Sequence, residues 1–227
     1  RRSYWMCRGC GVWSEWMRVE KKADNMKYAI VGAGGHALEM TEVLLSLGTH
    51  QKEIDYFVEE SFFDSASKLN TQSLDELVKK TDDYQIIIAI GDTSSREQIS
   101  IVLGSVTYPT IVHPSAVVGS STTLGIGNQI SQIACLTSNV LVGNFCIINV
   151  NAGAGHGSVI GNFVNLAPGA ALMGNVRIGN HCSIGPGALI LSGVEICDHV
   201  NILPGSVVNK SILASGTYGG SPARKIG

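Results

Sequence analysis

The chain has 227 residues, of which 16 are lysine or arginine and 18 are aspartate or glutamate, so its formal net charge is −2. This balance gives no electrostatic basis for binding nucleic acid or an anionic membrane surface, and the length allows one or two domains. No apolar run reaches the length of about 20 residues that a membrane span needs, and the charged start lacks the apolar stretch of a signal peptide. We therefore expect a cytoplasmic protein.

Residues 1–25 hold all three tryptophans of the chain and show neither helical nor alternating periodicity. Met26 then opens MKYAIVGAGGHA, which reads as a natural protein start. We interpret residues 1–25 as an extension outside the fold, either disordered or introduced by cloning; the alternative is an arm that packs on a neighbouring molecule. Cys7 and Cys10 form a lone CxxC, half of a zinc site without its other half, and we assign it no metal.

Strand and helix patterns alternate over residues 26–108. Apolar strands are predicted at KYAIVG, IDYFVEE and YQIIIAIGD, and helices at HALEMTEVLLSLG, SLDELVKK and REQISIVLG. Ser73 with Glu76, and Ser94 with Glu97, have the spacing of capping boxes at the starts of the last two helices. The β-α-β-α order indicates a small Rossmann-like domain, a parallel sheet covered by helices.

From Val112 the pattern changes to one aliphatic residue at every sixth position, and it continues without a slip to Val208. The series has seventeen positions in 97 residues, and only Ala154 lacks bulk. This period is typical of a parallel β-helix, in which each hexad supplies a short strand and a corner and three hexads close a triangular coil. The members are Val112, Val118, Leu124, Ile130, Leu136, Val142, Ile148, Ala154, Ile160, Leu166, Leu172, Ile178, Ile184, Ile190, Ile196, Ile202 and Val208.

Residues 18 apart share a corner of this coil, and each corner keeps its own chemistry. The three sets are Pro114, Pro168, Pro186 and Pro204; Asn144, Asn162, Asn180 and Asp198; and Ser120, Ser138, His156, Gly174 and Ser192. Asn and Asp tolerate left-handed turn geometry, so we expect it at the second corner. His156 is predicted to lie in a turn, where its side chain can leave the coil.

The coil region carries very few charges. Between residues 112 and 208 they are Arg177, Glu195 and Asp198. An exposed prism would carry more, so its faces are expected to pack against further copies of the chain. A cleft between subunits would then provide the pocket that a uniform repeat lacks.

Several motifs together resemble the bacterial sugar O- and N-acetyltransferases of the NeuD/PglD type. They are YAIVGAGGHA, IAIGDTSSREQI, TIVHPSAVVG, NAGAGHGSVIGNFVNLAPGAALMGNVRIG and YGGSPARKI, in the family's order. The resemblance implies a sugar-nucleotide-binding domain at 26–108 and a left-handed β-helix acyltransferase domain with a C-terminal tail at 109–227. It also implies homotrimers that hold acetyl-CoA between adjacent coils; the left-handed sense comes from the resemblance alone.

The same resemblance assigns the substrate site to the first domain. GAGGH follows a strand and precedes a helix, so its backbone amides can meet an anion, and Gly34, Gly35 and His36 are implied to touch the sugar nucleotide. Glu59 and Glu60 fall where the family has acidic residues at the end of the second strand, and Gly91 ends a further strand. An NAD-binding unit is the alternative, although GAGGHA has Ala37 at the third glycine position and the unit is small for a dinucleotide.

His156 matches the family's catalytic histidine, and a neutral imidazole with a pKa near ~6.5 suits the removal of a proton from an attacking amine or hydroxyl. The alternative is a surface histidine that fills a turn. Small neighbours, Ala154 among them, are expected to make room for a ligand. The family usually has Glu or Asp directly after this histidine, whereas this chain has Gly157, so we expect a weaker base.

The resemblance also places CoA. Asn165 stands where a histidine often contacts the thioester, and Gly174, Pro186 and Pro204 are implied to line the cofactor groove. Arg224 and Lys225 in the tail are candidates for contacting its phosphates. His181 and His199 stack in one column and could suggest zinc, but no close pair of histidines accompanies them and we expect no metal.

Taken together, these patterns predict an acetyl-CoA-dependent N-acetyltransferase acting on a nucleotide-linked amino sugar, a precursor of a surface glycan. Two alternatives stay open. One is O-acetylation of a sialic-acid-type sugar. The other is a catalytically silent β-helix that only binds a nucleotide sugar or scaffolds a partner, and Gly157 favours it.

Overall fold

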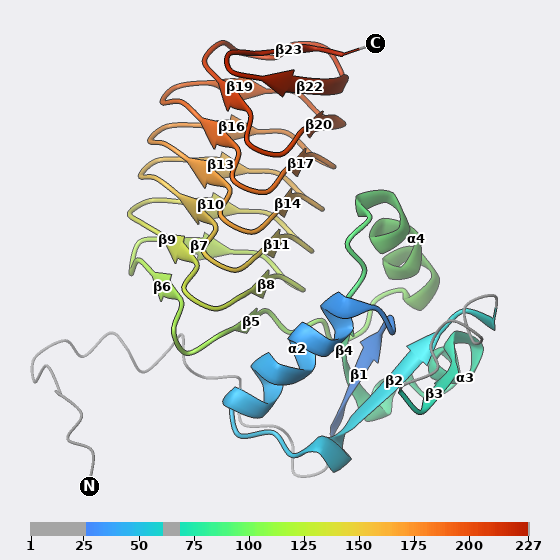
Figure 1. Ribbon diagram of the computed structural model, residues 1–227. Coiled ribbons are helices and arrows are strands. Elements are labelled where there is room, and N and C mark those ends of the chain that lie inside the picture. The colour runs from blue at the N-terminus through green and yellow to red at the C-terminus, as the bar shows by residue number, and fades with distance from the viewer. Residues whose placement is uncertain (1–25, 61–68, 227) are drawn as a thin grey trace, which may run out of the picture.

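The computed structural model describes residues 26–60 and 69–226, so the predicted extension at 1–25 lies outside the described residues. Two parts are visible in Figure 1: an α/β unit and a tall prism of short parallel strands. The last helix of the α/β unit ends at Leu103 and the first coil strand begins at Ile111. The expected boundary between residues 108 and 109 falls in this connection.

The α/β unit is a four-stranded parallel sheet with helices, as predicted. In the order β3-β2-β1-β4, its strands are β3 (Thr71–Ser73), β2 (Ile54–Val58), β1 (Lys27–Val31) and β4 (Tyr84–Ile88); its helices are α2 (Gly35–Ser46), α3 (Leu74–Val78) and α4 (Thr93–Leu103), with single 3₁₀ turns η1 (Gln51–Glu53) and η3 (Thr81–Asp83). The apolar runs of β1 and β4 are buried because helices cover both faces of a parallel sheet. The short edge strand β3 was not anticipated.

The N-cap predicted for α3 is confirmed, although only the Ser73 half of the expected capping box with Glu76 is formed, and the N-cap predicted for α4 is wrong. Ser73 caps α3 by accepting a hydrogen bond from the Asp75 amide at 3.2 Å. The cap expected at Ser94 is wrong, because Asp92 caps α4 by accepting from the Ser95 amide at 2.7 Å. These hydrogen bonds to its carboxylate hold the pKa of Asp92 below its ordinary value.

The remainder is the left-handed parallel β-helix, a triangular prism with three faces that we name I, II and III. Face I contains β5 (Ile111–Val112), β8 (Gln129–Ile130), β11 (Ile147–Ile148), β14 (Asn165–Leu166), β17 (Ser183–Ile184) and β20 (Val200–Ile202). Face II contains β6 (Val117–Val118), β9 (Cys135–Leu136), β12 (Gly153–Ala154), β15 (Ala171–Leu172), β18 (Leu189–Ile190) and β21 (Val207–Val208). Face III contains β7 (Thr123–Leu124), β10 (Leu141–Val142), β13 (Val159–Ile160), β16 (Arg177–Ile178) and β19 (Glu195–Ile196).

The six-residue aliphatic series points into the prism. Strands pair with the strand 18 residues away, so that Leu166 stacks on Ile148 and Ile184, and all three side chains are fully buried. Ala154 also points inward and is 2% exposed. Our expectation that it makes room for a ligand is therefore wrong, because its small side chain affects only the interior.

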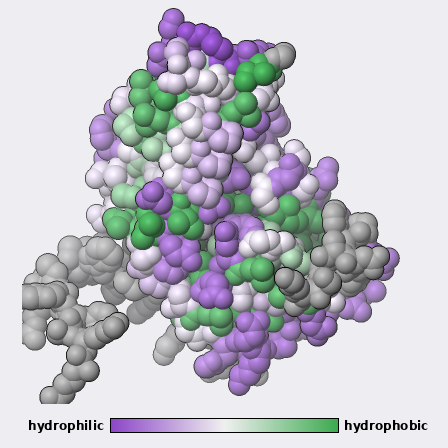
Figure 2. All heavy atoms as spheres, in the orientation of Figure 1, coloured by the Kyte–Doolittle hydropathy of each residue, from purple (hydrophilic) through white to green (hydrophobic). Residues whose placement is uncertain are grey.

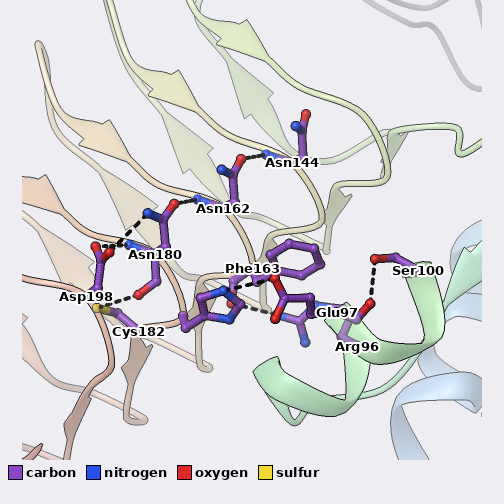
Figure 3. Close-up of polar contacts among 10 residues, drawn as sticks. Arg96, Glu97, Ser100, Asn144, Asn162, Phe163, Asn180, Cys182 and Asp198 are labelled. Carbon is purple, nitrogen blue, oxygen red and sulfur yellow. Dashed lines mark hydrogen bonds and ion pairs between the residues drawn. The ribbon is translucent and has the colours of Figure 1, made fainter. Parts of the chain in front are cut away.

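The Asn and Asp corner, between faces III and I, behaves differently from our expectation. Left-handed φ angles occur one residue later, at Phe145, Phe163, His181 and His199. The amide side chains instead form a ladder (Figure 3): the Oδ1 atoms of Asn144, Asn162 and Asn180 accept from the backbone N–H 18 residues earlier at 3.0, 2.8 and 2.8 Å, and Asp198 continues it at 2.7 Å. These residues are therefore selected for hydrogen bonding between coils.

The four left-handed residues form a column of stacked rings along the same corner. Ring centroids are 5.1 Å apart from Phe145 to Phe163, 5.1 Å from Phe163 to His181 and 4.9 Å from His181 to His199. Left-handed backbone is uncommon for bulky residues. Stacking between successive rings offsets that cost at every coil.

The far end of the prism is closed by a hairpin. β22 (Gly216–Gly220) extends face I and β23 (Ala223–Lys225) pairs antiparallel with it. Figure 2 shows hydrophilic residues gathered over this end, as expected where a repeat array stops. The longest described helix, α2, has 12 residues, and none of the described helices has the apolar length of a bilayer span.

Candidate active site and substrate cavity

A cavity of about 600 Å³ opens at the carboxyl ends of three parallel strands. The loops after β1, β2 and β4 line it together with the start of α4. Strands β2 and β4 lie on opposite sides of β1, so the strand order reverses at β1. Open α/β sheets bind ligands in the crevice at such a reversal. Of the six residues expected here, five line the cavity: Gly34, Gly35, His36, Glu59 and Gly91. Glu60 is exposed and does not line it.

The glycine-rich loop after β1 leaves backbone open to this cavity. Gly32 has φ +124°, and a Cβ there would lie 2.8 Å from the Ala89 carbonyl oxygen, so only glycine fits. Gly34 and Gly35 would meet no atom within 4 Å. Gly34 is the N-cap of α2 and supplies no side-chain cap, which leaves amides of the first turn available to an anionic ligand.

His36 is held at the cavity by a residue of the β-helix. The buried side chain of Gln129 on β8 donates from Nε2 to the Ile88 carbonyl at 2.9 Å. Its Oε1 therefore faces His36 and accepts from Nε2 of the ring at 2.8 Å, while Nδ1 lies 3.0 Å from Oε2 of Glu39. Sequence reasoning missed Gln129; a polar residue pointing outward from a strand is usually solvated, and only the docked α/β unit covers it.

His156 lies at the corner between faces II and III, and its side chain is exposed. Gly174, in the next coil of the same corner, makes room for the ring, since a Cβ on Gly174 would lie 2.6 Å from both Cε1 and Nε2 of His156. None of the ion pairs among the described residues includes His156.

Gly157 has a structural reason to be glycine. Its φ is +69°, and an added Cβ would collide with the side-chain oxygen of Asn175 in the next coil. A carboxylate directly after His156 would therefore need both a strained backbone and a displaced Asn175. This local packing explains why the residue after His156 is glycine and not a carboxylate.

The other residues expected at the cofactor are dispersed over the prism. Pro186 and Pro204 lie at the corner between faces I and II, and Asn165 points outward from face I on β14. The Oδ1 atom of Asn165 is buried and has no hydrogen-bond partner among the described residues. Within one chain these residues do not meet His156 and Gly174. Arg224 and Lys225 lie in the terminal hairpin, on β23.

The α/β unit and His156 occupy opposite sides of the prism. Gln129 contacts the α/β unit from face I, and Arg96 on α4 binds carbonyl groups at the corner between faces III and I. The corner that carries His156 is the vertex opposite face I. The cavity and His156 of one chain are therefore separated by the body of the β-helix.

Comparisons with known proteins identify both parts. Residues 27–103 match the PglD N-terminal domain and residues 175–210 match the bacterial transferase hexapeptide (six repeats). Both matched segments thus resemble the PglD-type hexapeptide-repeat acyltransferases. The chain is an enzyme of the acyl-transfer class.

Solved structures agree with this assignment over most of the chain. The acetyltransferase domain of PglB from Neisseria gonorrhoeae FA1090 is 29% identical, with TM-score 0.80 over 89% of this chain and 100% of that one. WeeI from Acinetobacter baumannii AYE is 28% identical, with TM-score 0.80 over 88% and 99%. PerB from Caulobacter crescentus, solved with CoA and GDP-perosamine, is 26% identical, with TM-score 0.79 over 88% and 97%. No curated protein sequence matches the chain.

The two histidines of the ring column are not arranged as a metal site in this acyltransferase. His181 and His199 stack face to face with 3° between their planes, and Nε2 of His181 lies 3.5 Å from Oε1 of Glu97. Among residues 26–60 and 69–226, no group of three or more His, Cys, Asp or Glu is placed to hold a metal ion.

The close approach of the His156 ring to Gly174 gives a direct prediction. Gly174→Ala is expected to fold normally but to lower kcat, because the added methyl group displaces the exposed His156 ring, whose side chain can rotate away. A misplacement of the order of 1 Å can cost about 100-fold in rate. Steady-state kinetics and thermal unfolding of the variant check this.

Ser192→Ala is the matched control, since Ser192 occupies the same corner one coil further and is exposed. It should leave both kinetics and unfolding unchanged. Wild-type kcat in Gly174→Ala would show that the position of the His156 ring is irrelevant to catalysis.

Proposed function

We propose that this acyltransferase uses acetyl-CoA to N-acetylate a nucleotide-linked amino sugar, a precursor of a surface glycan. The carrying observation is the 600 Å³ cavity at the strand ends, where a glycine loop with free amides adjoins His36 and Glu59. Amides at a helix start suit a diphosphate, and a carboxylate at the end of the second strand suits ribose hydroxyls. Supporting relatives are the PglB domain, solved with acetyl coenzyme A, and PerB, solved with GDP-perosamine.

The proposed reaction is a direct transfer. The sugar amine attacks the thioester carbonyl, so that an N–C bond forms and the C–S bond breaks. His156 accepts the proton of the amine and returns it to the thiolate sulfur of the departing CoA. No covalent acyl-enzyme is needed, and a burst of free CoA in the absence of sugar would contradict this step.

The complete site in this proposal lies between two copies of the chain. His156 of one copy faces away from its own cavity, so it serves a sugar nucleotide held by a neighbour. The outward positions of face II support such packing, because they hold no charged residue; they are Val117, Cys135, Gly153, Ala171, Leu189 and Val207. We propose a homotrimer, in which three copies bury these apolar rows.

The same arrangement would bring together the residues proposed to bind CoA. Gly174 of one copy and Asn165, Pro186 and Pro204 of its neighbour would line the groove. The residues present fit this role, since the buried Oδ1 of Asn165 has no partner in the described chain and can accept from the pantetheine amides. The backbone at the corners supplies the remaining contacts without added charge.

Leu189→Arg tests the interface. We expect light scattering to give a trimer for the wild type and a monomer for the variant, because three cations would be buried together in face II. Acetyl transfer should disappear while the β-helix stays folded, as circular dichroism would show. Asn201→Arg, at an exposed outward position of face I, should remain trimeric; a trimeric, active Leu189→Arg enzyme would place the interface elsewhere.

One observation supports a second candidate, a catalytically silent protein that only binds nucleotide sugars. His156 is exposed and none of the ion pairs among the described residues includes it, so no described carboxylate orients the ring. In that case nucleoside diphosphates would bind while acetyl-CoA stays intact.

A substrate panel separates the candidates. Consumption of acetyl-CoA should be stimulated by an amino sugar linked to UDP, GDP or dTDP, and the product should carry an acetylated amine. Acetylation of a hydroxyl on a sialic-acid-type sugar would favour O-acetyl transfer. Absence of turnover with every member, together with nucleotide binding by calorimetry, would contradict the proposal and support the silent protein.

A further inference from the structure

Among the described residues, Arg96 is the one charged residue whose side chain is fully buried. It lies on α4, and its exposed fraction is 0%. Its guanidinium donates to four backbone carbonyls: Nη1 to Ile90 at 2.6 Å and Gly91 at 3.1 Å, Nε to Phe145 at 2.8 Å and Nη2 to Phe163 at 3.0 Å. Figure 3 shows Arg96 extending from its helix toward the corner that carries Phe163.

The four acceptors belong to two different parts of the enzyme. Ile90 and Gly91 line the substrate cavity. Phe145 and Phe163 are successive left-handed residues at the corner between faces III and I. A single planar group therefore joins the lining of the cavity to two adjacent coils of the β-helix.

Burying this cation is costly. Loss of hydration lowers the pKa of Arg96 to about 10, with Asp92 acting in the opposite direction, so the side chain remains charged near neutral pH. None of the ion pairs among the described residues includes Arg96. Apolar side chains of similar volume are often as stabilising as a buried charge. The presence of a buried arginine here therefore favours a role in holding backbone groups in a fixed geometry.

We propose that Arg96 is a positioning residue for acyl transfer. It sets the cavity loop against the β-helix, and so fixes where a bound sugar nucleotide meets His156 of the neighbouring copy. The inference rests on the proposed function. A guanidinium suits the task because its donors form a rigid fork, whereas a lysine has one flexible ammonium group and cannot reach all four carbonyls.

The test combines kinetics with a readout that needs no turnover. For Arg96→Lys and Arg96→Ala we expect kcat/KM for the sugar nucleotide to fall by about 100-fold, while KM for acetyl-CoA stays near the wild-type value. Hydrogen exchange of the amides in residues 89–99 should rise, whereas exchange in the coils beyond residue 170 should not. Guanidinium ion, added well below denaturing concentrations, should restore part of the activity of Arg96→Ala by filling the vacated site.

Arg177→Ala is the matched control, since the Arg177 side chain is 64% exposed and its ion pair is with Glu195, which is also exposed. It should leave all these quantities unchanged. The proposal would be overturned if kcat, kcat/KM for the sugar nucleotide and kcat/KM for acetyl-CoA all fell by the same factor in Arg96→Lys. That factor would have to match the fraction of unfolded enzyme, and guanidinium would restore no activity. Arg96 would then have only a structural role. If the wild type transfers no acetyl group, the proposed function fails on its own, and unchanged exchange at residues 89–99 would still overturn the inference separately.

Discussion

Replacing His156 with glutamine is expected to lower kcat by about 10²–10⁴-fold, the usual contribution of a general base. Glutamine keeps the size and hydrogen-bonding capacity of the ring but cannot accept a proton at neutral pH. KM for acetyl-CoA should change little, because the proposed groove is lined by backbone and by other side chains. The measurement is a steady-state assay at saturating acetyl-CoA.

His199→Gln is the control for this loss, since His199 is an exposed histidine of the same β-helix at a different corner. It should retain wild-type turnover. Full activity in His156→Gln would remove the proposed base and leave the silent-binding alternative or another proton acceptor.

Truncating Leu166 to alanine should cost about 2–5 kcal/mol of unfolding free energy, because a buried leucine leaves a cavity that a closely packed coil cannot fill. Leu166 is fully buried and pairs with Ile148 below and Ile184 above, so both neighbours lose packing. Denaturant titration of the variant gives the value.

The outward, exposed Asn201 supplies the comparison. Asn201→Ala should change the unfolding free energy by no more than about 0.5 kcal/mol. A similarly small effect for Leu166→Ala would mean that the inward series does not form the main core.

The repeat could be predicted almost completely from the sequence, because each hexad repeats one local geometry and stacks on its own equivalent 18 residues away. The inward side chains and the chemistry of the three corners follow from that period. The shift of left-handed geometry from Asn144 to Phe145 could not be predicted by propensity, since stacking between coils offsets the unfavourable backbone of Phe145. Ala154 was misjudged although the six-residue period already placed its side chain inside the prism, because its nearness to His156 in the sequence was taken as nearness to a ligand.

The parts of the site that depend on packing between the α/β unit and the β-helix could not be predicted from the sequence. Gly34, Gly35 and Gly91 share one cavity because parallel strands end at a common edge. Gln129 and Arg96 gave no signal, since a glutamine on a strand and an arginine in a helix are ordinarily solvated. Both become buried only when α4 and β1–β4 pack on the β-helix, an arrangement that no local pattern encodes.

The central claim, that the cavity of one copy works with His156 of another, is best tested by mixing two inactive chains. Gly34→Trp fills the cavity, since a Cβ at Gly34 would meet no atom within 4 Å and the indole can extend from it, and His156→Gln removes the base. The account predicts that each variant alone keeps at most about a hundredth of the wild-type activity and that co-refolded trimers regain activity at about a quarter of the sites, as random pairing of neighbours requires. A mixture no more active than its separate components would contradict a shared site.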